Sequence, residues 1–282
     1  MSRAQLLQRS WSEAAAAYQE HMVPRFVPWT LATLDAFGST RIPEGLVVVP
    51  ACGPGQELPL LADLLPNHDI LGVDLAEGMV AIARRVIQHQ NLRRVTAMAG
   101  DAKSLTQLSG SRPITGIYSC FGLQIIPGPA ETLRSWAASL APGGTLAVTY
   151  WPEIAEQEGP WRTLISLTPP ADRPADWEVG IPGEALKEPG VELVADKGLD
   201  FSMEWPSAGA FFDILSTAGP WRALAILRGP AFMEELRRKF LATCPEADAE
   251  PLVHTLTARM IVLRKAGQIL SAWLIRDSIF ES

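Results

Sequence analysis

Hydrophobic residues recur along the first part of the chain at the spacing of an amphipathic helix. Between Ser10 and Ala36 they come every three or four residues, and Pro24 and Pro28 interrupt the pattern. Because proline removes a backbone donor and clashes with the preceding turn, we expect two helices joined by a proline kink. Residues 1–40 are therefore predicted to form an N-terminal helical cap.

Strand and helix signals then alternate. The β-branched run from Leu46 to Val49 predicts a buried strand, and helical spacing follows from Gly55 to Leu65. Further strands are predicted over 69–74, 95–98, 114–121 and 145–151, helices over 76–90 and 130–140, and a turn over 141–144. This rhythm requires right-handed crossovers, so residues 41–152 are predicted to form an α/β core, an open parallel sheet with helices on both faces.

The alternation stops after residue 152. Residues 153–188 are rich in proline and glycine, which predicts an irregular or partly helical insertion. Residues 189–282 are expected to complete the sheet and to form a lid. Their predicted elements are strands over 191–206 and 258–267 and helices over 207–217, 220–227 and 230–243.

Composition is that of a folded protein. Hydrophobic residues make up 48% and charged residues 20%, which excludes a mainly disordered chain. The formal net charge of -7 disfavours a nucleic-acid partner. No apolar run reaches the roughly 18–20 residues that span a membrane, and the charged N-terminus lacks the apolar core of a secretory signal. The three cysteines form no CxxC pair, so we expect a cytoplasmic protein with no metal site.

Small residues connect the first strand to the first helix of the core. Gly53 and Gly55 let the backbone turn tightly and approach a ligand at a helix N-terminus, where free amides favour polar or anionic groups. A nucleotide-like ligand fits such a turn, although a purely structural turn explains the glycines equally well. The dinucleotide-binding pattern GxGxxG is absent, because residues 56–58 supply no third glycine.

Acidic residues follow the next two strands. Asp74 closes the strand 69–74, where a carboxylate can accept hydrogen bonds from ribose hydroxyls. Capping of the next helix is a compatible second role for Asp74. Asp101, followed by Ala102, can accept a hydrogen bond from the amino group of adenine, although by itself this segment is only a turn.

The motifs together resemble a known family. ACGPG at 51–55, GVDLAEGM at 72–79, GDA at 100–102, FGLQIIP at 121–127 and LAPGGTLAV at 140–148 have the order of class I S-adenosylmethionine-dependent methyltransferases. Within that class they are similar to the ubiquinone/menaquinone-biosynthesis methyltransferase-like group. The resemblance covers about Ser12 to Trp151. It implies a Rossmann-like fold with a mostly parallel seven-stranded sheet, S-adenosylmethionine as cofactor, and methyl transfer to an O, N or C atom of a small, apolar or aromatic metabolite.

The resemblance also implies residue roles. Ala51, Gly53 and Gly55 would hold the methionine part of the cofactor, Asp74 the ribose, Leu75 and Met79 the ribose or adenine, and Asp101 and Ala102 the adenine, while Phe121 would sit beside the sulfonium and Tyr18 would close over the amino-acid end. Two positions depart from the family, which usually has acidic residues where this chain has Val49 and Gly116. These losses leave open a protein that keeps the fold without transferring methyl groups, or one that catalyses a cyclisation or rearrangement.

Catalytic candidates are few. His21, beside Tyr18, could act as a general base, although a partly exposed helix residue is the favoured interpretation. Gln124, Tyr150 and Trp151 are expected to line the substrate pocket, His68 and His89 to be solvated, and Cys52 and Cys120 to serve packing.

Two features concern substrate and partners. Nine tryptophans against three tyrosines, gathered mainly outside the cofactor motifs, predict an enclosed apolar pocket, with core packing favoured for each one singly. Leu270, Trp273, Leu274 and Ile275 form a candidate homodimer face, although packing on the chain's own sheet is the favoured use.

Overall fold

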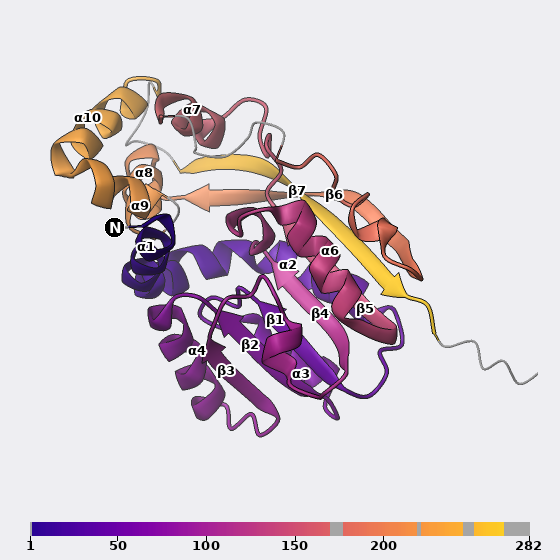
Figure 1. The fold of residues 1–282 in the computed structure, drawn as a ribbon. Coiled ribbons are helices and arrows are strands. Elements are labelled where there is room, and N and C mark those ends of the chain that lie inside the picture. The colour runs from indigo at the N-terminus through magenta and orange to yellow at the C-terminus, as the bar shows by residue number, and fades with distance from the viewer. Residues whose placement is uncertain (1, 170–176, 219–220, 245–250, 268–282) are drawn as a thin grey trace, which may run out of the picture.

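A seven-stranded sheet with helices on both faces forms the centre of the protein (Figure 1). The computed structural model describes residues 2–169, 177–218, 221–244 and 251–267. The strands are β1 (Leu46–Pro50), β2 (Asp69–Asp74), β3 (Val95–Ala99), β4 (Ile114–Cys120), β5 (Leu140–Tyr150), β6 (Val191–Trp205) and β7 (Leu252–Lys265). Their order is β3-β2-β1-β4-β5-β7-β6, with β7 antiparallel to both of its neighbours. The predicted Rossmann-like, mostly parallel sheet is confirmed.

The first strand supplies both cores of the molecule. All five residues of β1 are buried, and successive side chains point to opposite faces. Val47 packs in one core with Phe37, and Val48 packs in the other with Trp136. A β-branched run buried on both faces therefore forms the centre of a sheet covered by helices on both sides.

The N-terminal helices meet at a π-helical turn. Helix α1 (Arg3–Ala17) continues through η1 (Tyr18–Met22) into α2 (Val23–Gly38). Pro24 is the second residue of α2, directly after the π-helical turn, and Pro28 lies inside α2, so each removes one backbone donor from a continuous helical segment. The π-helical turn before Pro24 thus takes the place of the predicted proline kink.

Most other helices lie within a few residues of their predicted positions. The helices near predicted positions are α3 (Glu57–Leu64), α4 (Glu77–His89), α6 (Pro129–Ser139), α8 (Ala208–Ala218), α9 (Trp221–Arg228) and α10 (Pro230–Leu241). The structure adds α5 (Thr106–Ser109), η2 (Leu123–Ile125), α7 (Pro160–Leu167) and η3 (Ala185–Lys187), for which no individual helix was predicted. The described part of residues 153–188 contains α7 and η3. The candidate dimer face at 270–275 lies outside the described residues.

The predicted turn over 141–144 is wrong, because these residues belong to β5. Leu140 already pairs with Ile114, and pairing resumes between Thr145 and Gly116 after a shift in register. Gly143 has a φ of 79° inside this irregular stretch. Glycines that look like a turn in the sequence therefore form a bulge within a strand.

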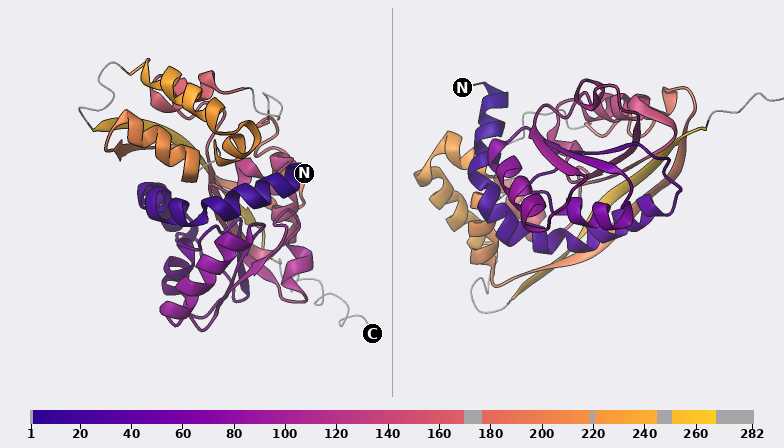
Figure 2. Two further views of the ribbon diagram at one scale, coloured as in Figure 1. Left: turned by 90° about the vertical axis from the view of Figure 1, so that its left-hand side faces the viewer. Right: turned by 90° about the horizontal axis from the view of Figure 1, so that it is seen from below.

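Helix α1 lies between the sheet and the C-terminal helices. It contacts α4 on one side and α8 and α9 on the other (Figure 2, left). In the described part of the chain no helix is long and apolar enough to cross a membrane.

The contact between α1 and α4 depends on a glycine. A Cβ on Gly78 would lie 2.5 Å from the carbonyl oxygen of Ser12. The Gly78 N–H donates to Ser12 Oγ at 3.4 Å, and Ala15 packs beside Met79. The two helices thus approach backbone to backbone, which brings Trp11 of α1 over the first turn of α4.

We expect Gly78→Ala to lower the free energy of unfolding by about 1–3 kcal/mol, because the added methyl must push α1 away from α4. Urea unfolding measures this change. Gly183→Ala is the control, since its Cβ would meet only one atom, at 3.6 Å. Equal stability of the two variants would contradict the assigned contact.

Candidate functional site

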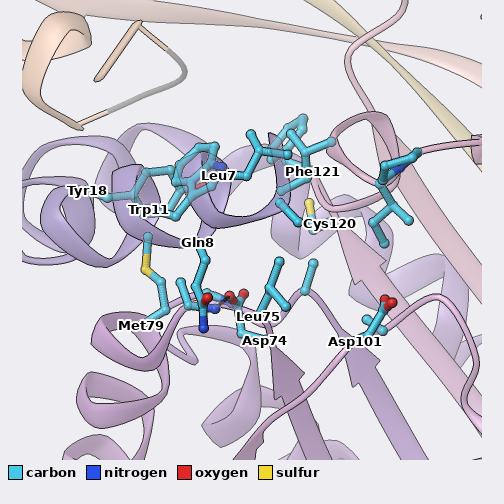
Figure 3. A pocket seen from close by; sticks show the side chains of 18 of the residues that line it. Leu7, Gln8, Trp11, Tyr18, Asp74, Leu75, Met79, Asp101, Cys120 and Phe121 are labelled. Atoms are coloured by element: carbon cyan, nitrogen blue, oxygen red, sulfur yellow. Dashed lines mark hydrogen bonds between the residues drawn. The ribbon is translucent and has the colours of Figure 1, made fainter. Parts of the chain in front are cut away.

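A cavity of about 390 Å³ lies between α1 and the carboxyl ends of β1 to β4. Its volume is within the usual range of small-molecule sites, and this edge of a parallel sheet is where α/β folds bind ligands. Figure 3 shows Trp11 and Tyr18 on one side of the cavity, opposite Asp74 and Met79. The fold therefore builds a site from segments that are far apart in the sequence.

The structure brings almost all of the predicted cofactor residues to this cavity. Those that line it are Tyr18, Ala51, Gly53, Asp74, Leu75, Met79, Asp101, Ala102 and Phe121. Gly55 is the exception, because its missing side chain makes room for α4, where a Cβ would lie 2.8 Å from that of Ala83. The roles of these residues toward a cofactor stay predictions.

Two turns at the cavity hold strained backbone. Ala51 has a φ of 52° and Phe121 a φ of 61°, a region that costs a side-chain-bearing residue roughly 1–2 kcal/mol. A Cβ on Gly122 would lie 2.8 Å from that of Ala51, so the turns after β1 and β4 touch. Strain of this kind persists where surrounding structure enforces it, and it clusters at ligand sites.

Asp74 is held rigidly at the end of β2. Its Oδ2 accepts from the Gly53 N–H at 2.8 Å, and its Oδ1 accepts from the Ala76 N–H at 2.9 Å. Burial raises the pKa of Asp74, while these backbone donors act in the opposite direction. Each carboxylate oxygen keeps a lone pair for a further donor, so Asp74 can still take a pair of neighbouring hydroxyls.

The turn after β3 carries a second acceptor. Asp101 is exposed, and its Oδ1 accepts from the Lys103 N–H at 2.9 Å. The indole N–H of Trp136 donates to the carbonyl oxygen of Ala102 at 2.8 Å, which anchors this turn to α6. Asp74 and Asp101 thus follow neighbouring strands of the sheet and line the same cavity.

Aromatic side chains pack behind Phe121, which lines the cavity. The Phe121 ring stacks on Trp151 with centroids 4.2 Å apart, and it lies 4.7 Å from the ring of Phe26. Trp29 packs edge-on against Trp151 at 5.2 Å. Among the described tryptophans Trp11 alone lines the cavity, so the others back the wall or fill the core instead of enclosing the pocket themselves.

The predicted catalytic candidates do not line the cavity. His21 is about one-third exposed, with its Nε2 3.9 Å from a Glu20 oxygen. Gln124, Tyr150 and Trp151 also lie outside the lining, where Tyr150 is fully buried and accepts from Arg259. No histidine, lysine or arginine occurs among the described lining residues.

The cysteines and His68 serve packing. Burial raises the pKa of both Cys52 and Cys120, which keeps these thiols protonated and unreactive, in line with their predicted packing role. His68 is buried, with its Nε2 2.9 Å from the carbonyl oxygen of Pro43, so the prediction of a solvated side chain is wrong. His89 is exposed as predicted.

A buried carboxyl group at the start of α3 was missed from the sequence. Glu57 is only 2% exposed, and burial raises its pKa to about 8. Its Oε1 accepts from Gln56 Nε2 at 2.7 Å, whereas Glu57 Oε2 and Gln56 Oε1 have no hydrogen-bond partner among the described residues. The available signal was a glutamate directly after a glycine turn, at the start of a buried helix.

Val49 and Gly116, the two positions that depart from the family, lie in closely packed parts of the core. Val49 is 1% exposed in the core beneath the sheet. A Cβ on Gly116 would lie 2.8 Å from the ring of Phe37, so the close packing of α2 leaves no room for an aspartate there. Neither position offers a carboxylate to a ligand in the cavity.

A family comparison matches the strands that carry the site. Residues 47–144 match the family described as "Methyltransferase domain". Residues 47–144 are thus similar to a methyltransferase domain over the part of the chain that carries the site. The match includes the turns with Ala51, Asp74, Asp101 and Phe121, which line the cavity.

Curated relatives with a similar sequence bear a more specific name. A trans-aconitate 2-methyltransferase of Methylobacterium nodulans is 33% identical over 124 residues, which cover 44% of this chain and 45% of that protein. The enzyme of the same name from Streptomyces avermitilis is 36% identical over 97 residues, covering 34% of this chain and 35% of its own. The matched part of the chain thus spans less than half the length of these relatives.

Solved structures share the fold at low sequence identity. The YcgJ protein of Bacillus subtilis has a TM-score of 0.53 at 15% identity, covering 84% of this chain and 98% of its own. Phosphoethanolamine N-methyltransferase 2 of Haemonchus contortus was solved with S-adenosyl-L-methionine. It has a TM-score of 0.55 at 16% identity, and the match covers 95% of this chain and 60% of that protein. The [4+2]-cyclase SpnF has a TM-score of 0.51 at 18% identity, and the match covers 85% of this chain and 80% of that protein.

We expect the stability of this domain to fall between about pH 5 and pH 8 because of Glu57. The folded state holds this proton up to a pKa of about 8, whereas the unfolded chain releases it near the ordinary glutamate pKa of 4.5. Rising pH therefore favours unfolding across this window. Glu57→Gln should remove this part of the pH dependence. Thermal unfolding of the unaltered protein and of the variant from pH 5 to pH 8 measures this difference. If the stability of both proteins changed with pH in the same way, the raised pKa of Glu57 would be contradicted.

Proposed function

We propose that the chain is an S-adenosylmethionine-dependent methyltransferase that acts on a small, apolar or aromatic acceptor. The observation that carries the proposal is the pair of acceptors Asp74 and Asp101, which follow neighbouring strands and line one cavity beside the glycine turn at Gly53. Ribose hydroxyls and an adenine amino group are donors that match these two carboxylates. The match of residues 47–144 to a methyltransferase domain supports the same ligand.

Orphaned polar atoms indicate that the residues fit this cofactor. Gln56 lines the cavity with an unpartnered buried oxygen, and a Cβ on Gly53 would have only that oxygen within 4 Å, so the turn leaves open space beside it. When bound, S-adenosylmethionine supplies an electrophilic methyl group, which an electron-rich atom can attack in line. The chain itself would hold the ribose on Asp74 and exclude water with the wall formed by Phe121 and Trp151.

The walls of the cavity favour an apolar acceptor over a polyanion. Leu7, Trp11, Phe121, Ile125 and Ile126 are apolar, and the charged residues of the described lining, Asp74 and Asp101, are acidic. trans-Aconitate carries three carboxylates, and the described lining residues include no cation to pair with them. The name of the curated relatives therefore does not extend to the acceptor proposed for this chain.

The acceptor is proposed to be nucleophilic without help from the protein. No histidine or lysine lies among the described lining residues, and burial raises the pKa of Tyr18 well above its ordinary value. A neutral amine carries its own lone pair, so it needs no general base from the chain to attack the methyl group. The finer likeness to ubiquinone/menaquinone-biosynthesis enzymes stays a prediction. Likeness to the cyclase is a likeness of fold, and one fold hosts many activities.

Transfer of a labelled methyl group tests this function. The protein is incubated with methyl-labelled S-adenosylmethionine and a metabolite extract divided into apolar and polar fractions, with trans-aconitate as a separate sample. We expect label in a product from the apolar fraction. Label in trans-aconitate alone would overturn the proposed acceptor class, and absence of label in every sample would overturn the activity.

We expect Asp74→Asn to weaken binding of S-adenosylhomocysteine by about 1–3 kcal/mol, because an amide replaces a carboxylate that accepts two ribose hydroxyls. Isothermal titration calorimetry measures the affinity. Asp69→Asn is the matched control, since Asp69 begins the same strand and pairs with Arg94 on the surface. Unchanged affinity in the Asp74 variant would remove the ribose assignment.

A further inference from the structure

Two side chains at the start of α3 have buried oxygen atoms with no hydrogen-bond partner in the described structure. Gln56 lines the cavity, and Glu57, 2% exposed, lies next to it in the chain and in space. The Gln56 amide donates to Glu57 Oε1 at 2.7 Å, which leaves Gln56 Oε1 and Glu57 Oε2 without partners among the described residues. Buried polar atoms are normally paired, so two unpaired oxygens in one place indicate a missing polar partner.

The pair lies at one particular part of the cavity. Gln56 Oε1 is the atom that a Cβ on Gly53 would approach, at 4.0 Å, so it is beside the glycine turn. The charge of Glu57 also acts on Tyr18 and Cys120, which line the cavity. If Asp101 takes the adenine and Asp74 the ribose, the next part of the ligand reaches this turn.

We propose that Gln56 and Glu57 bind the α-ammonium group of the methionine part of the cofactor. An ammonium group has three donors and no acceptor, which complements the Gln56 oxygen and, once Glu57 has released its proton, the Glu57 carboxylate. This inference rests on the proposed function, and it assigns to the start of α3 the contact that the missing carboxylate at Val49 would otherwise make. Gln56 would contact the ammonium directly at the cavity, and Glu57 would supply the opposite charge behind it.

The surroundings of Glu57 support a cationic ligand. No cation acts on its carboxyl group in the described structure, where burial is the main influence and Gln56 is the side chain that bonds it. The titratable groups on which Glu57 acts are Tyr18, Cys52, Tyr118 and Cys120, with Asp74 close to Tyr18 and Cys52. None of them carries a positive charge, so a cation beside Glu57 would be supplied by the ligand.

Proton release gives this contact a distinct signature. Without a ligand the pKa of Glu57 is about 8, so the carboxyl group is largely protonated at pH 7. An ammonium group beside it favours the charged form and lowers the pKa. Binding at pH 7 should therefore release a proton from Glu57, and affinity should rise with pH up to about 8.

Calorimetry with two ligands tests the inference on the full chain. S-Adenosylhomocysteine carries the amino-acid part, whereas 5′-methylthioadenosine lacks it. At pH 8 we expect Glu57→Gln to weaken binding of S-adenosylhomocysteine roughly 10- to 100-fold and to leave binding of 5′-methylthioadenosine unchanged. Glu77→Gln is the matched control, because Glu77 begins the next helix with a side chain that is 64% exposed.

The unaltered protein provides a second measurement that needs no variant. Titrations at pH 7 in buffers of different ionisation enthalpy count the protons released, and we expect release with S-adenosylhomocysteine and none with 5′-methylthioadenosine. Equal proton counts for the two ligands, or equal weakening of both ligands by Glu57→Gln, would overturn the assignment. Failure of the unaltered protein to bind either ligand would instead overturn the proposed function on which it rests.

Discussion

The close approach of α1 to α4 at Gly78 is the constraint on which the site depends. Because Gly78 has no side chain, the backbone of Ser12 can lie against the first turn of α4. That contact sets Trp11 and Tyr18 opposite Asp74 and closes what would otherwise be an open sheet edge. Without it, the same acidic strand ends would face solvent, where hydrogen bonds to a ligand contribute little.

The closed cavity has an unusual balance of polar groups. It offers acceptors at Asp74, Asp101 and Gln56 but no cation among its described lining residues. Such a site complements a ligand that carries hydroxyl, amino and ammonium donors, and it disfavours polyanions. The same balance explains why burial raises the pKa of Glu57, since no neighbouring cation is present to counter it.

Local patterns in the sequence were sufficient for the elements that carry the fold. The run at Leu46 predicts β1, and the acidic residue that ends β2 predicts one side of the site. Features that depend on contacts between distant segments could not be predicted in this way. Burial of Glu57 and of His68, and packing of Phe37 against Gly116, arise only when the sheet and helices assemble.

Sequence patterns gave wrong predictions where one residue type occurs in two kinds of structure. The glycines near 143 resemble a turn but form a bulge, because Leu140 had already paired with β4. Tryptophans outside the cofactor motifs resemble a pocket lining, yet Trp29 and Trp151 pack against each other behind the wall. A sequence pattern states that a large aromatic ring is buried, but not whether protein or ligand covers it.

A crystal structure of the full chain with S-adenosylhomocysteine is the most direct test of this account. We expect the ribose hydroxyls to donate hydrogen bonds to Asp74, and the ligand's amino nitrogen to lie within about 3 Å of Gln56 Oε1 or the Glu57 carboxylate. A ligand bound outside the cavity, or an amino group held elsewhere while Gln56 and Glu57 stay unpartnered, would contradict it.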